Sequence, residues 1–463
     1  MDGGPDEIVT NSLWLDGVRD QLTHRSPLPG DAEVDVAIIG AGFTGLWTAR
    51  ALLDLEPAIR VTVVDRHHVG FGASGRNGGW ASALFAGRRD RMAGTGGAET
   101  VRAHHRAMLD AIDDIERCCN ADGIDARFHR GGTLTLSRNP AQDDRVRSIV
   151  ADDRRWGIGE EHSWLLSAER CDERIRVTGS RLGAFTPDCA RIDPARLVLG
   201  LADAVEARGA RIHERTAAIE VSPGRVTTEH GTLRAGTVVV ATEGWTPTLP
   251  QRRRSLLPIY SLMIATEPLS AACWDEIGWS GAETLTDGRH LFVYAQRTAD
   301  GRIAFGGRGA PYHFGSRVEP RFDRNPKTFA ALHDALVEMI PGVAGAAITH
   351  RWGGPLGVPR DWESSVGLSP DRRIGWAGGY VGDGVTTTNL AGRTLADLIL
   401  GRTTERTALP WVGHRSQPWE PEPLRWLGVR GMLALARSAD RSEARHRRPA
   451  RRRGQLLDAL TGH

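Results

Sequence analysis

The stretch Val34-Asp-Val-Ala-Ile-Ile-Gly40-Ala-Gly42-Phe-Thr-Gly45-Leu46 sets a glycine-rich turn between a hydrophobic run and an amphipathic segment. Gly40 permits a tight turn, Gly42 lets backbone N–H groups approach a pyrophosphate at a helix N-terminus, and Gly45 allows close helix–strand packing. Asp65 ends the next hydrophobic run, at the distance that one βαβ unit needs, and its carboxylate can accept hydrogen bonds from a ribose. The stretch therefore predicts a dinucleotide-binding fold.

A single Gly-x-Gly-x-x-Gly motif is weak evidence for dinucleotide binding, because it also occurs in ordinary tight loops. The residues on either side of the turn add to this evidence. Residues 34–39 and 60–65 have the continuous apolar character of buried parallel strands. Between them, Leu46, Ala49 and Leu53 recur at helical spacing. The motif thus opens a helix directly after a strand, which favours dinucleotide binding over an unrelated loop.

Length and charge limit the classes of protein to consider. A chain of 463 residues can form two or three structural domains, and a net charge of +2 argues against a general nucleic-acid binder. The acidic opening lacks the features of a signal peptide, and no apolar stretch is long enough to cross a bilayer. We therefore expect a cytoplasmic protein with no transmembrane segment.

The sequence offers no recognisable metal site. The histidine pairs His67-His68 and His104-His105 hold adjacent residues, whose side chains point apart on a helix or strand, so we interpret them as surface histidines. The five cysteines show neither CxxC nor zinc-ligand spacing, and we expect reduced thiols. They are Cys118, Cys119, Cys171, Cys189 and Cys273.

A second glycine-rich segment follows the first βαβ unit. The loop Gly70-Phe-Gly72-Ala-Ser-Gly75-Arg-Asn-Gly78-Gly79 holds five glycines in ten residues, so its backbone can wrap closely around a ligand. A flexible linker is the alternative interpretation. We favour the ligand because the segment directly follows the acidic strand end where a ribose would lie.

The rest of the chain alternates helical and strand patterns. Asp193 is an expected N-cap followed by Pro194 at the first helical position. Short runs rich in β-branched and aromatic residues within 258–308 predict a separate antiparallel sheet. We expect helices at 98–118, 194–208, 325–340 and after the glycines of 378–384, and strands at 131–136, 211–221, 231–240, 259–266, 290–296, 302–306, 348–353 and 374–378.

Four segments together resemble the FAD-dependent D-amino acid oxidase-like superfamily. They are the early glycine turn with Asp65, residues 72–79, residues 239–245 and the late turn Gly379-Tyr-Val-Gly-Asp-Gly-Val385. The similarity spans about residues 30–400. Within the superfamily the chain looks most like the γ-glutamylputrescine oxidase, sarcosine oxidase and glycine oxidase branch.

This resemblance implies an α/β fold with a glutathione-reductase-type Rossmann-like FAD domain and an α+β substrate domain whose antiparallel sheet covers the flavin. The FAD domain would be discontinuous. The expected ranges are an N-terminal lead-in at 1–33, the FAD domain at 34–95, 170–255 and 345–405, the substrate domain at 96–169 and 256–344, and a C-terminal tail at 406–463.

The resemblance also implies which residues would bind FAD. The early turn would meet the pyrophosphate, Asp65 the adenosine ribose, and Ala218 would lie near the adenine. The last helix would present its N-terminus to the flavin pyrimidine, where reduced flavin carries negative charge. The implied cofactor-binding residues are Gly40, Gly42, Phe43, Thr44, Gly45, Asp65, Arg66, Gly72, Ala73, Ser74, Gly75, Arg76, Asn77, Gly78, Gly79, Ala218, Thr242, Gly244, Trp245, Gly382, Asp383, Gly384, Val385 and Thr386.

The implied reaction oxidises a small primary or secondary amine or an amino acid. Hydride transfer to flavin N5 would give an imine, water would hydrolyse the imine, and O2 would reoxidise the flavin to give H2O2. Arg308, Tyr380 and Asp383 are the expected catalytic residues. An arginine would suit a carboxylate on the substrate, and Asp383 could bind an amine cation. Tyr260, Met263, Tyr294, Gln296, Tyr312 and Trp352 would form the walls of the substrate pocket, although aromatic residues in short strands are more often core.

Two positions depart from the sarcosine oxidase pattern. Those relatives use a lysine above the flavin to promote reaction with oxygen, but Lys327 is the only lysine of this chain and the matching stretch offers Arg308. The same relatives attach the flavin to a cysteine, and residues 352–358 contain none, so we expect non-covalent FAD.

Several alternatives stay open at this point. The chain could be a dehydrogenase of the same fold that uses another electron acceptor, an NAD-dependent enzyme, or a flavin-binding protein without turnover. The segment 424–436 could be a membrane-binding or partner-binding helix or a packed terminal helix. The amine itself and the oligomeric state do not follow from the sequence.

Overall fold

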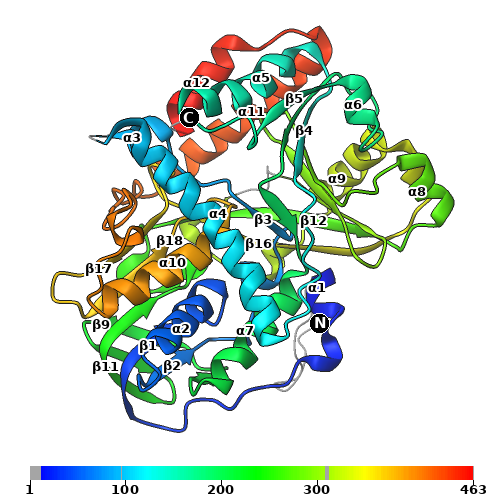
Figure 1. Cartoon of the computed structure of the whole chain (residues 1–463). Helices are drawn as coiled ribbons and strands as arrows, with labels where there is room; N and C mark the ends of the chain where they lie inside the picture. Colours follow the sequence, from blue (N-terminus) through cyan, green and yellow to red (C-terminus); the bar gives the residue numbers. More distant parts are fainter. Residues whose placement is uncertain (1–11, 95, 308–311, 462–463) are drawn as a thin grey trace.

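Two large β-sheets with helices packed on them form the body of the molecule (Figure 1). The computed structural model describes residues 12–94, 96–307 and 312–461. The first sheet carries the early glycine turn, and the second is built largely from the middle of the chain. An α/β dinucleotide-binding part and a second α+β part are therefore both present, as expected.

The first sheet has its hydrogen-bonded strands in the order β17-β18-β11-β1-β2-β8. The pairs of β1 with β2 and with β11 are parallel, and Ile38 lies opposite both Val63 and Val239. These three apolar side chains are fully buried, which explains why this part of the sequence reads as continuous apolar runs. The strands, with the β9–β10 ribbon joined to β11, are β1 Ala32–Ile39, β2 Val61–Val64, β8 Arg211–His213, β9 Ala218–Ser222, β10 Arg225–Thr228, β11 Gly231–Val240, β17 Ser365–Leu368 and β18 Ile374–Gly378.

The expected single strand at 211–221 is wrong, because the chain forms two strands there. β8 pairs with β2 in parallel, whereas β9 pairs with β10 in antiparallel orientation. Between them the buried carboxylate of Glu214 accepts hydrogen bonds from the backbone N–H groups of Arg25 and Val69. These hydrogen bonds satisfy the buried carboxylate at the point where the chain passes from one strand to the next.

Four helices cover the first sheet and one another, α2, α4, α7 and α10 (Figure 1). In α7 the Asp193 side chain caps the N-terminus and Pro194 opens the helix, as expected. Helix α4 is longer than expected and ends at Gly123, which adopts the left-handed conformation. The helices are α2 Phe43–Leu55, α4 Gly97–Asp122, α7 Pro194–Ala207 and α10 Gly384–Ile399.

The second sheet has the strand order β16-β12-β15-β14-β13-β4-β6-β5. Its expected antiparallel character is confirmed for β12, β14 and β15, but β13 and β4 pair in parallel. Helices α5 Pro140–Arg155, α6 Ala168–Asp172, α8 Ala271–Ile277 and α9 Pro326–Met339 accompany it. The strands are β4 Thr133–Ser137, β5 Trp164–Ser167, β6 Leu182–Thr186, β12 Leu257–Thr266, β13 Thr284–Asp287, β14 Val293–Arg297, β15 Ile303–Gly307 and β16 Ile348–Val358.

The membership of two strands bears on the expected domain boundaries. β6 and β16 fall inside the ranges 170–255 and 345–405 that we assigned to the FAD domain. Both form their hydrogen bonds within the second sheet. The expected boundaries stay a prediction, and the pairing of these two strands favours moving them from the FAD domain to the substrate domain.

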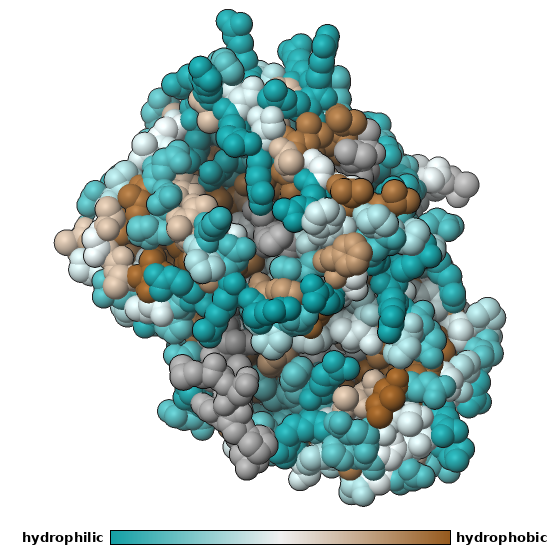
Figure 2. Space-filling model, turned by 180° about the vertical axis from the view of Figure 1, so that it is seen from behind, coloured by the Kyte–Doolittle hydropathy of each residue, from teal (hydrophilic) through white to brown (hydrophobic). Residues whose placement is uncertain are grey.

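The C-terminal tail packs on the second sheet through α11 Leu424–His446, which α12 Arg451–Thr461 follows. Val429, Leu433 and Ala439 of α11 are buried, and the Asp440 carboxylate accepts hydrogen bonds from the backbone of residues 290–291. The packed terminal helix is therefore the correct alternative. Among the described residues, none of the helices combines the length and the apolar composition of a transmembrane span. On the face shown in Figure 2, hydrophobic residues form separate patches among hydrophilic ones.

Candidate active site

The early glycine turn joins β1 to α2, and its geometry depends on two glycines. Gly40 has φ +112°, and a Cβ there would lie 2.4 Å from the carbonyl oxygen of Ala241. A Cβ on Gly45 would lie 2.0 Å from the carbonyl oxygen of Gly40. Gly42 is the N-cap of α2 and has no side chain to cap it, so the N–H groups of the first turn, apart from that of Phe43, are open to a ligand.

Asp65 closes this turn from the end of β2. Its carboxylate accepts hydrogen bonds of 2.8 Å from the backbone N–H groups of Ala41 and His67. Burial raises the pKa of Asp65, and these two N–H groups oppose the rise. Asp65 thus fixes the shape of the turn and also lines the cleft beside it.

The second glycine-rich loop crosses from the early turn toward the second sheet. It contains a short 3-10 helix, Ala73–Gly75, and the Ser74 hydroxyl accepts a hydrogen bond of 2.8 Å from the backbone N–H of Phe43. The Asn77 side chain holds the loop by accepting a hydrogen bond from the N–H of Gly79. The loop is therefore a structured wall and not a flexible linker.

The late turn lies against the early one. It precedes α10, whose N-cap Asp383 makes no side-chain capping hydrogen bond. The hydroxyl groups of Tyr380 and Thr44 lie 3.0 Å apart and form a buried hydrogen bond between the two turns. Two helix N-termini, those of α2 and α10, consequently face one cleft, an arrangement that favours bound negative charge.

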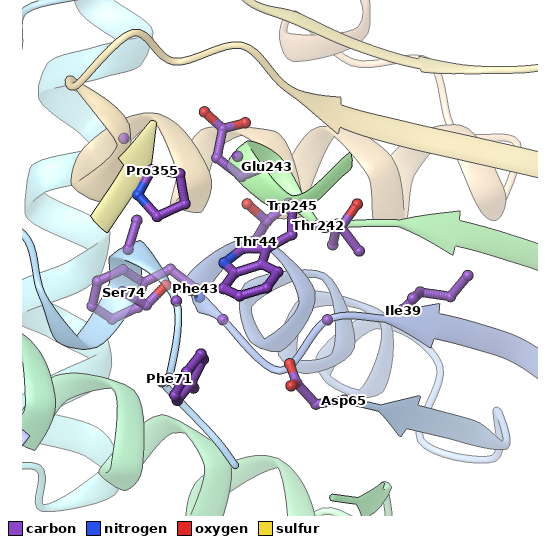
Figure 3. A pocket seen from close by; sticks show the side chains of 18 of the residues that line it. Ile39, Phe43, Thr44, Asp65, Phe71, Ser74, Thr242, Glu243, Trp245 and Pro355 are labelled. Atoms are coloured by element: carbon purple, nitrogen blue, oxygen red, sulfur yellow. Dashed lines mark hydrogen bonds between the residues drawn. The ribbon is translucent and has the colours of Figure 1, made fainter. Parts of the chain in front are cut away.

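The cleft between the two turns has a volume of about 1170 Å³, its open mouth included. Figure 3 shows Asp65, Phe71 and Trp245 around the same space. The cofactor-binding residues we expected and find on its wall are Gly40, Gly42, Phe43, Thr44, Asp65, Arg66, Gly72, Ala73, Ser74, Asn77, Ala218, Thr242, Gly244, Trp245, Gly382, Gly384 and Val385.

Four expected cofactor-binding residues line neither this cleft nor the cavity beside it. Gly45 and Gly75 pack against backbone carbonyl oxygens, and Gly79 packs against Gln296, so each allows close approach of chain segments instead of facing a ligand. Thr386 is buried within α10. Three others, Arg76, Gly78 and Asp383, line only the neighbouring cavity.

The walls fit a dinucleotide in their polar atoms as well as in their shape. The side-chain N–H groups Trp245 Nε1 and Arg76 Nη2 are buried on the two cavity walls and make no hydrogen bond. Buried donors of this kind are costly unless a ligand satisfies them. The phosphate, carbonyl and hydroxyl oxygens of FAD can accept hydrogen bonds from these two N–H groups. The residues of the two cavity walls therefore fit FAD.

Sequence reasoning missed Glu243, which lies on the cleft wall shortly after the end of β11. Its carboxylate accepts hydrogen bonds from the backbone N–H groups of Gly379 at 2.9 Å and Tyr380 at 3.3 Å. Burial raises the pKa of Glu243 to about 7, against the effect of these N–H groups. The available signal was an acidic residue shortly after a buried apolar strand, and it ties the late turn to the first sheet.

The histidine pairs are not surface residues, which corrects our expectation. His68 and His104 are buried, and His67 lines the cleft, where its ring stacks on Phe71 with centroids 3.8 Å apart. Burial lowers the pKa of His67 to about 4. His67 is therefore neutral near pH 7 and adds an aromatic wall to the cleft.

A second cavity of about 810 Å³ adjoins the cleft. Its wall carries the aromatic side chains of Trp80, Phe292 and Tyr294 and the carboxylate-bearing Asp383. The Tyr294 hydroxyl lies 2.8 Å from the Ser261 hydroxyl of β12. Both cavities share six wall residues, namely Ala73, Asn77, Pro355, Leu356, Gly382 and Val385.

Of the expected substrate residues, only Tyr294 lines the second cavity. The other five are buried inside the fold. The Tyr312 hydroxyl bonds to Glu422, Trp352 Nε1 donates to the carbonyl oxygen of Arg76, and Gln296 Nε2 donates to that of Gly78. Tyr260 packs edge-on against His313, and Met263 lies in the core. Their polar atoms already have partners, so these side chains support the walls from behind.

The expected catalytic residues differ in how they are placed. Asp383 lines the second cavity, whereas Tyr380 lines only the first and bonds to Thr44. The Tyr380 hydroxyl therefore links the two turns and does not face the second cavity. Arg308 lies outside the described residues.

Known proteins resemble this chain over most of its length. Residues 35–398 match the family DAO, FAD dependent oxidoreductase. The chain is 30% identical to the probable oxidoreductase OrdL of Rhizobium meliloti (strain 1021), over 82% of this chain and 86% of that protein. It is 29% identical to the gamma-glutamylputrescine oxidoreductase of Escherichia coli (strain K12), over 79% and 84%.

Its fold is similar to the crystal structure of glycine oxidase from Geobacillus kaustophilus. The TM-score is 0.70 at 20% identity, covering 83% of this chain and 99% of that one. The likeness confirms the expected fold, and the family match confirms the expected resemblance. The chain belongs to the DAO family of FAD-dependent oxidoreductases, and FAD is its cofactor.

Proposed function

We propose that this protein oxidises a small primary or secondary amine, or an amino acid, to an imine, with O2 as the final electron acceptor. The second cavity is the observation that carries this proposal. It adjoins the FAD cleft, shares wall residues with it, and combines aromatic walls with the carboxylate of Asp383. Aromatic faces and a carboxylate both favour an amine cation.

The residues that would hold FAD come from both glycine turns. The open N–H groups of α2 would bind the pyrophosphate, and Asp65 would accept hydrogen bonds from the ribose. The α10 N-terminus would face the flavin pyrimidine. No cysteine lines the described walls of either cavity, which supports non-covalent binding. When bound, FAD supplies a two-electron acceptor.

The substrate would react in two steps, oxidation of the amine and hydrolysis of the imine, and O2 would then accept the electrons. A bound ammonium ion first releases one proton to water, and the neutral amine then loses a hydride from the carbon and a proton from the nitrogen, which leaves an imine. Water hydrolyses the imine to a carbonyl compound and releases the amine nitrogen. O2 takes up the two electrons and two protons as H2O2. The chain's part is to orient the amine with Asp383 and to exclude bulk water with the walls formed by Trp80, Phe292 and Tyr294.

An anaerobic screen of amines, amino acids and N-methylated compounds tests the proposal. A substrate of the proposed class bleaches the flavin absorbance without oxygen, and in air it yields one H2O2 for each amine oxidised. Bleaching without peroxide in air would support a dehydrogenase that uses another acceptor. If no compound of a broad panel bleaches the flavin, the amine oxidation itself is refuted.

Substitution of Arg308 tests whether O2 or another compound accepts the electrons. The fixed positive charge of Arg308 can attract the negative charge that develops on O2. We expect Arg308→Ala to slow flavin reoxidation by about tenfold in stopped-flow measurements, with FAD content unchanged, as one lost charge interaction of roughly 1.4 kcal/mol would do. Arg317→Ala, at an exposed position on the same stretch, is the control. An unchanged reoxidation rate would remove Arg308 from this role.

A further inference from the structure

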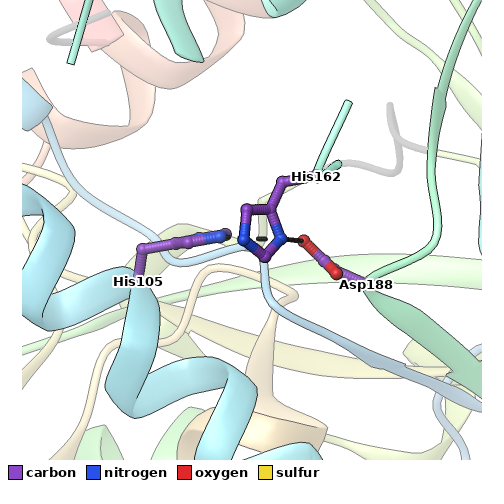
Figure 4. Close-up of side chains that lie close together, drawn as sticks. All are labelled: His105, His162 and Asp188. Atoms are coloured by element: carbon purple, nitrogen blue, oxygen red, sulfur yellow. Dashed lines mark hydrogen bonds and ion pairs between the residues drawn. The ribbon is translucent and has the colours of Figure 1, made fainter. Parts of the chain in front are cut away.

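Two histidines and an aspartate from distant parts of the sequence meet away from both cavities (Figure 4). His105 comes from α4, His162 from the loop between α5 and β5, and Asp188 from the turn between β6 and the strand β7 Cys189–Arg191. One side-chain atom from each of the three lies within 4.8 Å of the other two. The fold therefore assembles a compact group of nitrogen and oxygen donors that the sequence did not reveal.

The distances suit coordination of a metal ion. Asp188 Oδ2 lies 2.8 Å from His162 Nδ1 and 3.7 Å from His105 Nε2. Bonds of about 2.0–2.2 Å to a tetrahedral ion separate neighbouring ligand atoms by roughly 3.3–3.5 Å. The two observed distances lie on either side of this range and the third lies within 4.8 Å, so side-chain rotations would have to bring the three atoms onto one ion.

The state of His105 distinguishes this group from an ordinary His–Asp pair. His105 Nε2 is buried and makes no hydrogen bond. This nitrogen lies 3.7 Å from Asp188 Oδ2, and the His105 ring lies edge-on to the ring of His162 with centroids 4.9 Å apart. A bound metal ion would give this buried nitrogen a partner beside another imidazole and a carboxylate.

A second group of similar composition differs because its carboxylates already have hydrogen-bond and ion-pair partners. His290, Asp440 and Glu443 also lie close together. There, however, the Glu443 carboxylate pairs with both terminal nitrogens of Arg145, and Asp440 accepts two backbone hydrogen bonds. Arginine already supplies the positive charge in that cluster, so an ion has no role in it.

The surroundings of His105, His162 and Asp188 also favour a cation. Arg89 approaches the group, but it pairs with Asp152 and Asp153 at 2.9 and 2.7 Å. Asp153 also accepts a hydrogen bond from Ser163, next to His162 in the sequence. Arg106 also lies near His105 but pairs with Glu99 at 2.7 Å, so both guanidinium groups have carboxylate partners other than Asp188.

We propose that His105, His162 and Asp188 bind a divalent transition-metal ion of the zinc type, with water in the remaining position. Two imidazoles and one carboxylate form a donor set that suits Zn²⁺ and disfavours Mg²⁺ and Ca²⁺. The ion joins α4 to the β6–β7 turn. That turn supports the second cavity, because the carbonyl oxygen of Asp188 accepts a hydrogen bond from Ala83, next to the β3 strand Trp80–Ser82. None of the three residues lines either cavity, so the site is independent of the proposed reaction.

Zinc binding to the FAD-loaded protein tests the proposal directly. After removal of metal by a chelator and dialysis, we expect one Zn²⁺ per chain in competition with a chromogenic chelator, and a rise of the thermal unfolding midpoint with Zn²⁺ but not with Mg²⁺. His105→Phe removes one ligand and keeps the ring volume. It should weaken zinc binding at least tenfold and abolish the stabilisation by Zn²⁺.

The neighbouring histidine provides the matched control. His104→Phe makes the same change one residue earlier, at a buried side chain that contacts Phe85 and Trp411 and does not belong to the group. It should retain one Zn²⁺ per chain. If His105→Phe fails to bind FAD, Asp188→Asn serves instead, because the amide can still bond to His162 but is a poor zinc ligand. Failure of the wild-type protein to retain zinc, or equal binding by the ligand variants, would overturn the site.

Discussion

The FAD cleft and the second cavity adjoin each other but are built in different ways. The cleft is formed mainly by backbone turns of short contiguous segments, with glycines where chain segments approach closely. The second cavity also uses the loop at 73–78, but most of its wall comes from β3, β12, β16, residues 292–294 and the N-terminus of α10, which are far apart in the sequence. Cofactor binding thus depends on local backbone geometry, and substrate binding depends on how the second sheet pairs.

Breaking the backbone geometry of the cleft should have the largest effect. Gly40→Ala places a Cβ 2.4 Å from the Ala241 carbonyl oxygen and forces a residue with a side chain to φ +112°. We expect at least a hundredfold loss of FAD affinity, measured by flavin fluorescence during titration of the apoprotein. Gly345→Ala is the control, since a Cβ there meets nothing within 4 Å. Normal FAD affinity in Gly40→Ala would show that side chains, and not the turn, decide binding.

The next largest effect concerns Glu243, a buried charged side chain on the wall of the cleft. Its pKa in the folded protein is about 7, above the ordinary 4.5, so the folded state holds the proton more tightly than the unfolded state. Its contribution to stability is therefore fully present below pH 4.5 and is lost as the pH rises to 7. This change amounts to about 3 kcal/mol.

Glu243→Gln removes this titration. The free energy of unfolding of the wild-type protein, relative to Glu243→Gln, should decrease by about 3 kcal/mol between pH 4.5 and pH 7 and stay constant above. Denaturant unfolding at several pH values measures it. Glu220→Gln, at an exposed position on β9, gives the background. A wild-type stability that rises relative to Glu243→Gln over this range would show a lowered pKa and contradict the argument.

In the second cavity the corresponding change is Asp383→Asn. The backbone bonds of residue 383, from its N–H to Tyr380 and from Thr387 to its carbonyl oxygen, do not involve the carboxylate. Loss of a charge-assisted hydrogen bond of about 1.5–3 kcal/mol should raise KM for an amine about 10- to 100-fold, with FAD content unchanged. Steady-state kinetics measure it, and Asp334→Asn on the exposed face of α9 is the control. Equal KM values would mean that the amine is recognised elsewhere.

The same contrast explains what could be predicted from the sequence. Gly40, Gly42 and Asp65 follow one another at fixed spacing, and that local spacing determines the βαβ unit. Residues such as Tyr312 and Trp352 were expected on a pocket wall because they are aromatic and lie near strands. Whether such a side chain faces a cavity or the core depends on sheet register and on distant partners such as Glu422. Neither can be read from neighbouring residues.

Glu243 and the group around His105 illustrate the same limit. Glu243 is recognisable as an acidic residue after an apolar strand, but its partners at residues 379–380 are more than a hundred positions away. His105 has a polar environment only because α4 passes His162 and Asp188. Periodicity predicts helices and strands from nearby residues, while these contacts depend on tertiary packing.

The smallest expected effect tests whether Tyr380 belongs to the cleft or to catalysis. Tyr380→Phe removes the hydrogen bond to Thr44 and leaves the ring in place, which should cost about 1 kcal/mol and weaken FAD binding about fivefold. Thr44→Val should have the same effect, and the double variant should be little worse, because both changes remove one interaction. Tyr260→Phe, at a buried position on β12, is the control. If Tyr380→Phe instead slows anaerobic flavin bleaching a hundredfold with FAD affinity intact, the Tyr380 hydroxyl contacts the reacting amine. A residue of the FAD cleft would then take part in the reaction of the substrate in the second cavity.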